Sequence, residues 1–313
     1  ANGTRTVRFV GLENYRAVFS GPDFWPAVLN TFKYLVWSLL IGFLLPIALA
    51  IGIHESVRFK GVYRTAVYLP NIVPGLATVF LWRYLFKSDG AGGLNMLLGA
   101  FGIAPQDWLN NAARVIPMIV VTMTWKGAGS TALLYLAGLQ GISPELYEAA
   151  IIDGASVRQR VLHVTVPQLY NLARTLLILQ VIAVFQVLYE PLVMTNGGPN
   201  NASISLMQLV YRYAFDKFDY SKASAVSVIV AAALILLTLV YNRVNKEKDM
   251  MQQSYARDCA ELTRLREQYN QLSTENAQHC EELRLIHASR GFKLLNMGYP
   301  IKKRIWKIFG KEI

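Results

Sequence analysis

Long apolar runs alternate with short polar stretches over the first 245 residues of this chain. Five of the runs reach or approach the roughly 20 residues that an α-helix needs to cross a bilayer. Each run contains Gly, Pro, Ser, Thr or Asn, as is typical of membrane helices that pack closely against one another. The pattern predicts an all-α membrane protein, a polytopic transmembrane helix bundle with five visible spans at about residues 28–53, 69–86, 115–139, 173–194 and 224–241.

The overall composition supports this class of protein. Of the 313 residues, 53% are hydrophobic and 16% are charged, which is too apolar for an ordinary soluble domain of this size. Basic loops beside anionic lipid account for the net charge of +11, so membrane lipid and not nucleic acid is the expected charged partner. Both cysteines, Cys259 and Cys280, lie in the polar C-terminal part and are expected to be free thiols.

Lysine and arginine residues set the expected orientation, because cytoplasmic loops carry an excess of them. Nine basic residues fall on the side that holds residues 143–167, and five fall in the two opposite loops. If that side is cytoplasmic, five spans leave residues 1–27 outside, where Arg5, Arg8 and Arg16 weaken the bias. We therefore expect residues 1–27 to be an extracytoplasmic stub that follows a further span, and residues 28–245 to be the membrane domain.

Residues 143–167, which we call the bent segment, are too many for a simple connection between two spans. Ser143, Pro144 and Glu145 combine a capping hydroxyl, a preset φ and an acid in the first turn, and so predict a helix start. The helix is expected to run to about Ile152. Gly154 then supplies a backbone conformation that side chains resist, so a bend is predicted there.

A second short helix is predicted after the bend, starting at Ser156 and ended by Pro167. The two helices and their tight turn are expected to project from the bilayer as a cytoplasmic docking element. An alternative is a re-entrant or interfacial loop that packs only on the bundle.

The bent segment resembles the EAA loop of binding-protein-dependent ABC transporter permeases, whose pattern is E-A-A-x3-G-x9-I-x-L-P. Val164 and Val166 replace the Ile and Leu of that pattern, and Arg158 stands where an aromatic residue is common. Three further stretches, FVGLENY, LAGLQGISPELYEAAIIDGAS and TNGGPNNAS, resemble the carbohydrate-uptake branch of the family, the maltose and glycerol-phosphate type. The residues that match the loop are Glu148, Ala149, Ala150, Asp153, Gly154, Ala155, Val164 and Pro167.

This resemblance implies a multi-pass protein of the bacterial plasma membrane with a six-span core. It implies a second permease subunit, two ATP-binding subunits that hold ATP and Mg, and an extracytoplasmic solute-binding protein as partners. The EAA loop would lie in a groove of the ATP-hydrolysing subunit, with Glu148 and Asp153 near basic groups and Gly154 at the bend. The cargo would be a sugar or a related polyol or sugar phosphate.

Motifs for nucleotide, metal or nucleophilic chemistry are absent from the sequence. There is no G-x-x-x-x-G-K-[ST], H-E-x-x-H or C-x-x-C, so no catalytic residue, metal site or cofactor of its own is expected on this chain. The stretch KGAGST, residues 126–131, is expected to serve helix packing. Polar residues in or near apolar runs are candidates for the substrate pathway or for interhelical hydrogen bonds; they are Lys126, Gln180, Gln186 and Glu190.

The chain becomes hydrophilic after residue 245. Residues 246–288 carry a heptad pattern that predicts a parallel coiled coil, and Asn276 falls at an a position, where a buried amide can fix the register. A lone amphipathic helix is the alternative. The a and d positions are Leu262, Leu265, Tyr269, Leu272, Asn276, His279, Leu283 and Ile286.

Residues 289–313 predict a basic amphipathic tail for an anionic membrane surface, with Lys302, Lys303, Arg304 and Lys307 among apolar side chains. The whole tail also weakly resembles the coiled-coil linkers of some bacterial glycosyltransferases. This leaves a second function open, that of a membrane-associated glycosyltransferase accessory or scaffold, although no D-x-D motif is present. A fused tail without a role in transport is a third possibility.

Overall fold

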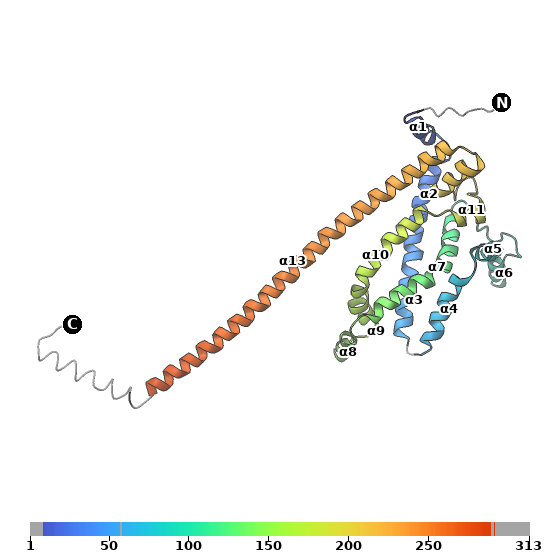
Figure 1. The fold of residues 1–313 in the computed structure, drawn as a ribbon. Helices are drawn as coiled ribbons and strands as arrows, with labels where there is room; N and C mark the ends of the chain where they lie inside the picture. Colours follow the sequence, from blue (N-terminus) through green and yellow to red (C-terminus); the bar gives the residue numbers. More distant parts are fainter. Residues whose placement is uncertain (1–8, 57, 289–290, 292–313) are drawn as a thin grey trace, which may run out of the picture. The chain divides into compact units, whose positions relative to one another are not determined.

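The computed structural model describes residues 9–56, 58–288 and 291, and every regular element in that part of the chain is helical. The chain divides into two compact units at Tyr241 and Asn242. The predicted all-α class is confirmed (Figure 1). In order, the helices are α1 (Glu13–Phe19), α2 (Phe24–Trp37), α3 (Leu44–Glu55), α4 (Lys60–Ile72), α5 (Gly75–Leu85), α6 (Gly93–Ala100), α7 (Val115–Gln140), α8 (Pro144–Ile152), α9 (Val157–Arg160), α10 (Val166–Phe185), α11 (Tyr189–Thr195), α12 (Leu206–Tyr211) and α13 (Tyr220–Ala288).

Three short π-helical segments accompany these helices: η1 (Ser38–Phe43) and η2 (Val161–Thr165) each join two helices without interrupting them, and η3 (Arg212–Asp216) extends α12. Through η1 and η2, the helices flanking them form continuous stretches at Phe24–Glu55 and Val157–Phe185. Both stretches are long and apolar enough to cross a membrane, as is Tyr220–Lys246.

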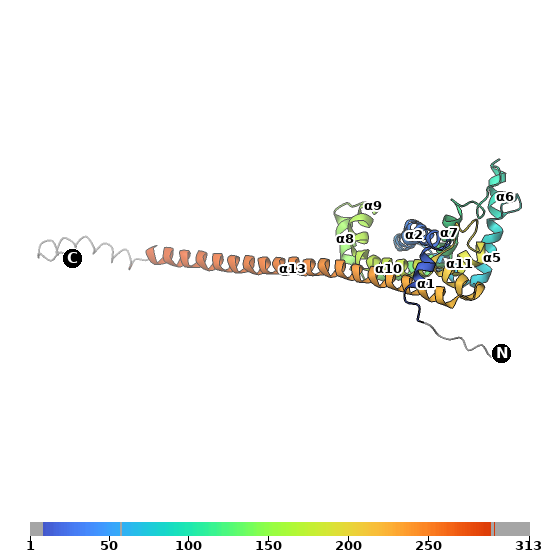
Figure 2. The same ribbon diagram turned by 90° about the horizontal axis from the view of Figure 1, so that it is seen from above.

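Helix α7 forms the centre of the first unit. Its apolar residues are distributed around the whole helix, and a helix of this kind is stable only when it is surrounded. It accordingly contacts α2, α3, α4, α5, α10 and α11. Seen from above, α7 lies between α2 and α5 (Figure 2). The third predicted span, residues 115–139, coincides with this helix, although α7 is not among the described helices that are apolar enough to cross a membrane by themselves. The first and fifth lie within Phe24–Glu55 and Tyr220–Lys246.

The second predicted span, residues 69–86, is wrong as a single helix. Helices α4 and α5 meet there at an angle of 96°. Pro74 causes the break, because a proline disfavours helical backbone in the residue before it, and Val73 is extended with φ −63° and ψ 129°. Pro74 also lacks the N–H that would continue the hydrogen bonds of α4.

The fourth predicted span, residues 173–194, has the wrong boundaries at both ends. The continuous helix runs from Val157 to Phe185, so it begins well before residue 173. It stops before α11, because Gln186 and Leu188 leave the helical region at the end of α10 and the start of α11.

The second unit contains the C-terminal part of α13, which remains helical through Ala288. The heptad residues therefore lie on a helix, as predicted, whereas their pairing with another helix stays a prediction. Cys259 and Cys280 are exposed free thiols. Apart from Gly291, the predicted basic tail lies outside the described residues, as do Arg5 and Arg8.

Glycine 129 permits the close approach of α7 and α4, which confirms the packing role predicted for KGAGST. A Cβ atom at this position would lie 2.0 Å from the carbonyl oxygen of Val67 and 2.9 Å from the Cα of Tyr68. A Cβ atom at Gly127, two residues earlier on the same helix, would have no neighbour within 4 Å among the described atoms.

We predict that Gly129→Ala destabilises the bundle by about 1–3 kcal/mol, because the two helix backbones must move apart. Gly127→Ala is the matched control and should not lower the free energy of unfolding. Thermal unfolding of the purified protein in detergent measures both. Equal melting temperatures for the two variants would contradict the close packing of α4 on α7.

Candidate functional site

The bent segment begins with α8, as predicted. Ser143 is the N-cap residue, Pro144 is the first helical residue, and Glu145 places a carboxylate in the first turn. The predicted capping role of the Ser143 hydroxyl is wrong, because the side-chain oxygen accepts no hydrogen bond from the first turn of α8. The N–H of Leu146, which such a bond would use, donates to the backbone carbonyl of Ser143 at 3.2 Å instead.

Gly154 forms the bend after α8 with φ +76°, a left-handed conformation that side chains resist. Two backbone hydrogen bonds close the end of the helix: Gly154 N–H donates to the Ile151 carbonyl at 3.0 Å, and Ala155 N–H donates to the Ala150 carbonyl at 2.9 Å. This pair of bonds is a Schellman motif, which satisfies carbonyls that the helix end would otherwise leave free. The bend is therefore a defined structure.

A capping box starts the second helix directly after the bend. The Ser156 Oγ accepts from the Gln159 backbone N–H at 3.4 Å, and the Gln159 Oε1 accepts from the Ser156 backbone N–H at 2.8 Å. Each residue satisfies a backbone donor of the other. The helix is thus stabilised at its first turn, one residue after the predicted start.

Pro167 does not end this helix, contrary to our prediction. The ring of a proline clashes with the carbonyl four residues earlier, which here belongs to His163. His163 lies in η2, where the wider π-helical turn shifts the carbonyls out of the α-helical register and leaves room for the ring. The backbone therefore stays helical from Val157 into α10, and the second half of the bent segment is the beginning of a membrane span.

Two side-chain contacts attach the bent segment to the bundle, and a third, between Tyr147 and Thr165, joins its two helices. Arg160 forms an ion pair with Glu55 at the end of α3, with 3.3 Å between Nη2 and Oε2 and both side chains mostly buried. The Tyr147 hydroxyl lies 3.1 Å from the Thr165 Oγ1, and its ring lies 5.5 Å from that of His54. The segment lies at the same end of the bundle as the end of α3 and the start of α4, opposite α1 (Figure 1).

The residues that match the EAA pattern are mostly exposed at this end. Glu148, Ala149, Asp153, Gly154 and Pro167 are exposed, and Ala150, Ala155 and Val164 are partly exposed. Among the described residues, neither the Glu148 nor the Asp153 carboxylate forms an ion pair. Large apolar side chains are exposed beside them, at Leu146, Ile151, Ile152 and Val157, with Ile152 at 85%.

Lys126 on α7 lies at the break between α4 and α5. Its Nζ donates to the Val73 carbonyl at 2.6 Å, and the Asn71 carbonyl is 3.5 Å away. The last carbonyls of a helix have no partner within it and carry the negative end of its dipole. The lysine thus satisfies backbone groups that the break between α4 and α5 exposes.

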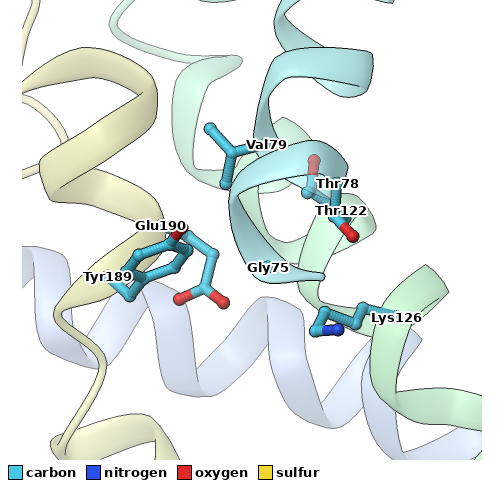
Figure 3. Close-up of a pocket in the computed structure, with 7 residues that line it drawn as sticks. All are labelled: Gly75, Thr78, Val79, Thr122, Lys126, Tyr189 and Glu190. Carbon is cyan, nitrogen blue, oxygen red and sulfur yellow. The ribbon is translucent and has the colours of Figure 1, made fainter. Parts of the chain in front are cut away.

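Glu190 on α11 and Lys126 on α7 line the same small pocket (Figure 3). The cavity is about 30 Å³, which is room for about one or two waters. A sugar ring does not fit this conformation. The pocket is lined by Gly75, Thr78, Val79, Thr122, Lys126, Tyr189 and Glu190.

The structure separates the other two candidate pathway residues from this pocket. Gln180 donates a hydrogen bond to the Ser38 Oγ, which lies in η1, so the interhelical alternative applies to it. Gln186 is exposed at the end of α10. Only Lys126 and Glu190 share a site.

A buried network of hydrogen bonds from α2 holds residues 195–203, which we call the Asn-rich loop. No pattern in the sequence predicts this network. Asn30 Nδ2 donates to the Asn201 carbonyl at 2.7 Å, and the Tyr34 hydroxyl donates to the Ser203 carbonyl at 2.9 Å. Asn196, Gly197, Asn200 and Asn201 all have positive φ, which explains why glycine and asparagine dominate this loop.

No cluster of three or more metal-ligating side chains occurs among the residues that the structure describes. The polar groups of the Lys126 pocket are a lysine, a glutamate, two threonines and a tyrosine. This set suits hydrogen bonding and charge pairing better than the coordination of a transition metal, which imidazole and thiolate ligands favour.

Comparison with known proteins identifies the family. Residues 27–247 match the family described as binding-protein-dependent transport system inner membrane component. The chain is 34% identical to the trehalose/maltose transport system permease protein MalF of Thermococcus litoralis, over 76% of this chain and 80% of that protein. It is 30% identical to the arabinooligosaccharides transport system permease protein AraP of Bacillus subtilis, over 75% of each.

The fold is similar to that of a chain in the crystal structure of a bacterial ABC transporter involved in the import of the acidic polysaccharide alginate. The TM-score is 0.72 at 25% identity, over 77% of this chain and 85% of that chain. The glycosyltransferase alternative has no support among these relatives. The chain belongs to the binding-protein-dependent transport system inner membrane components, and it is a multi-pass permease subunit of an ABC importer, not an enzyme.

Proposed function

We propose that this chain is one of two permease subunits of an ATP-driven importer for a sugar or a related polyol or sugar phosphate. A solute-binding protein would deliver the cargo from outside, and two partner subunits would bind ATP and Mg and supply the energy. The names of the relatives, which concern maltose, trehalose and arabinooligosaccharides, support the carbohydrate class. The observation that carries the proposal is the exposed helix, bend and helix of the EAA pattern.

The bent segment is the element that would receive motion from an ATPase subunit. Its first helix is closed by the Schellman motif at Gly154, and its second is continuous with α10. The Arg160–Glu55 ion pair adds a connection to the end of α3. A rigid-body displacement of the apex would therefore move two spans together, which is the kind of motion that alternates access across a bundle.

The exposed side chains of the bent segment indicate what kind of surface on the ATPase subunit would bind it. Ile151, Ile152 and Val157 offer an apolar surface next to the Glu148 and Asp153 carboxylates. A complementary groove would bury the apolar groups at its centre and place basic groups around them, as is usual for protein interfaces.

The Lys126 pocket is the part of the chain best placed to gate the substrate pathway. Three elements meet there: the break between α4 and α5, the middle of α7, and the start of α11. A broken helix can change its bend at low cost only if its freed carbonyls keep a partner, and Lys126 supplies one. We propose that this pocket widens when the importer changes state, and that Lys126 and Glu190 then face the pathway.

Replacing Gly154 tests the proposed docking role. Valine resists φ +76°, whereas asparagine, of similar size, adopts this conformation more readily. We expect Gly154→Val to reduce ATP-driven uptake by about tenfold or more, equivalent to about 1.4 kcal/mol, and Gly154→Asn to retain most of it. Uptake and ATP hydrolysis are measured together in proteoliposomes that hold the complete importer. Equal, full uptake by both variants would refute the role of the bend.

The Arg160–Glu55 ion pair should couple the bent segment to α3. We expect Glu55→Gln and Arg160→Gln each to lower uptake, and the double variant to lose less than the sum of the two. The interaction energy should be about 1 kcal/mol, because the pair is mostly but not fully buried. Additive losses in this double-mutant cycle would show that the pair transmits nothing.

Removing the Lys126 ammonium should impair gating. In Lys126→Met the carbonyls of Val73 and Asn71 lose their donor, at a cost of about 1–3 kcal/mol, so uptake should fall about tenfold at unchanged expression. Lys87→Met is the control, since Lys87 is exposed and pairs only locally with Asp89 at 2.6 Å. Normal uptake by Lys126→Met would contradict the proposed gate.

A further inference from the structure

The C-terminal part of α13 carries one apolar stripe that has no part in the transport mechanism proposed above. We call the a and d residues from Leu262 to Ile286 the heptad seam. Leu262, Leu265, Tyr269, Leu272 and Leu283 each expose more than half of their surface in this structure. The residues around the seam are mostly polar or charged, so the helix has a single apolar side.

A helix of this composition gains little stability by itself in water. Most helical stability in proteins comes from packing an apolar face against a partner, and an isolated helix is marginal even with favourable residues. The strict 3 and 4 spacing over almost four heptads is the pattern that supercoils two helices around each other. The seam therefore points to a second helix as its partner.

The charges beside the seam favour a second copy of this chain in parallel orientation. The g positions hold Glu261, Gln268, Glu275 and Glu282, and Arg266 occupies the e position of the first heptad. In a parallel pair, a g residue faces the e residue of the next heptad on the partner, so Glu261 of each copy would face Arg266 of the other. In an antiparallel pair, g residues face each other, and the glutamates would repel.

Asn276 supports the same arrangement. It lies at an a position in the middle of the seam, where two copies in register would place their amides side by side. A buried asparagine pair at a specifies a two-stranded coil and its register, at some cost in stability. His279, the d residue of the same heptad, keeps its Nδ1 3.4 Å from the Glu282 carboxylate, so its polar ring is partnered at the edge of the seam.

We propose that the heptad seam forms a parallel, in-register, two-stranded coiled coil with a second copy of this chain. The interface is self-complementary, as a two-fold contact requires, because each copy offers both members of the Glu261–Arg266 pair. If the importer holds one copy of this chain beside a different permease, as proposed above, the coil joins two complete importers. Transport itself does not depend on the coil.

Cysteine crosslinking tests the register and the identity of the partner. In full-length protein with Cys259→Ser and Cys280→Ser, Asn276→Cys would place two thiols face to face at an a layer. We expect mild oxidation to give a homodimer in most of the protein. Thr274→Cys, at the outward f position, is the matched control and should stay monomeric. A crosslink to a different chain, or no homodimer from Asn276→Cys, would overturn the proposal.

The mass of the assembled importer provides a second measurement. Light scattering in detergent should give twice the mass of one importer, and Leu265→Asp with Leu272→Asp should halve it while uptake is unchanged. Thr263→Asp with Thr274→Asp places the same charges on b and f positions and should leave the doubled mass intact. A single-importer mass for the unmodified protein would refute the coil, whereas lost uptake in these variants would refute its independence from transport.

Discussion

The continuity of the backbone from Val157 to Phe185 determines how this permease subunit can work. A proline in the middle of that stretch would normally end the helix. The π turn before Pro167 removes the clash and lets the helix pass from the polar end of the bundle into the apolar span. A loop at this place would absorb any displacement of the bent segment, whereas a continuous helix transmits it.

The same principle, that backbone groups in an apolar environment need partners, explains the other irregular sites. The break between α4 and α5 exposes carbonyls, and Lys126 satisfies them. The Asn-rich loop closes a few turns with its own backbone hydrogen bonds, and Asn30 and Tyr34 on α2 bind the carbonyls of Asn201 and Ser203. In each case a polar side chain on a regular helix holds an irregular segment in one conformation. Such segments can change conformation only if these partners change with them.

Much of this architecture could be predicted from the sequence. The apolar runs predicted a transmembrane helix bundle, because the bilayer fixes the length and composition of a membrane helix. Gly154 marked the bend because few other residues adopt its conformation. The heptad spacing likewise marked a helix after residue 245, which the structure describes through Ala288.

The remaining features depend on tertiary context. Pro74 breaks a helix while Pro167 does not, and the π turn before Pro167 leaves room for its ring. The meeting of Lys126 with Glu190 joins residues from α7 and α11, and no local pattern predicts it. Asn30 and Tyr34 looked like ordinary members of an apolar run. Their hydrogen bonds reach residues about 170 positions away, so local periodicity gives no sign of them.

Crosslinking from the apex of the bent segment is the most direct test of the central claim, that an ATPase subunit binds this segment. Ala149→Cys is introduced into a chain in which both native cysteines are replaced by serine. The complete importer, shown to take up its substrate, is then treated with a reagent that joins a thiol to nearby lysines. Ala104→Cys, exposed in the loop between α6 and α7, is the control. The account predicts capture of the ATP-binding subunit from Ala149→Cys alone, with a yield that changes with nucleotide. No capture, or equal capture from both positions, would contradict it.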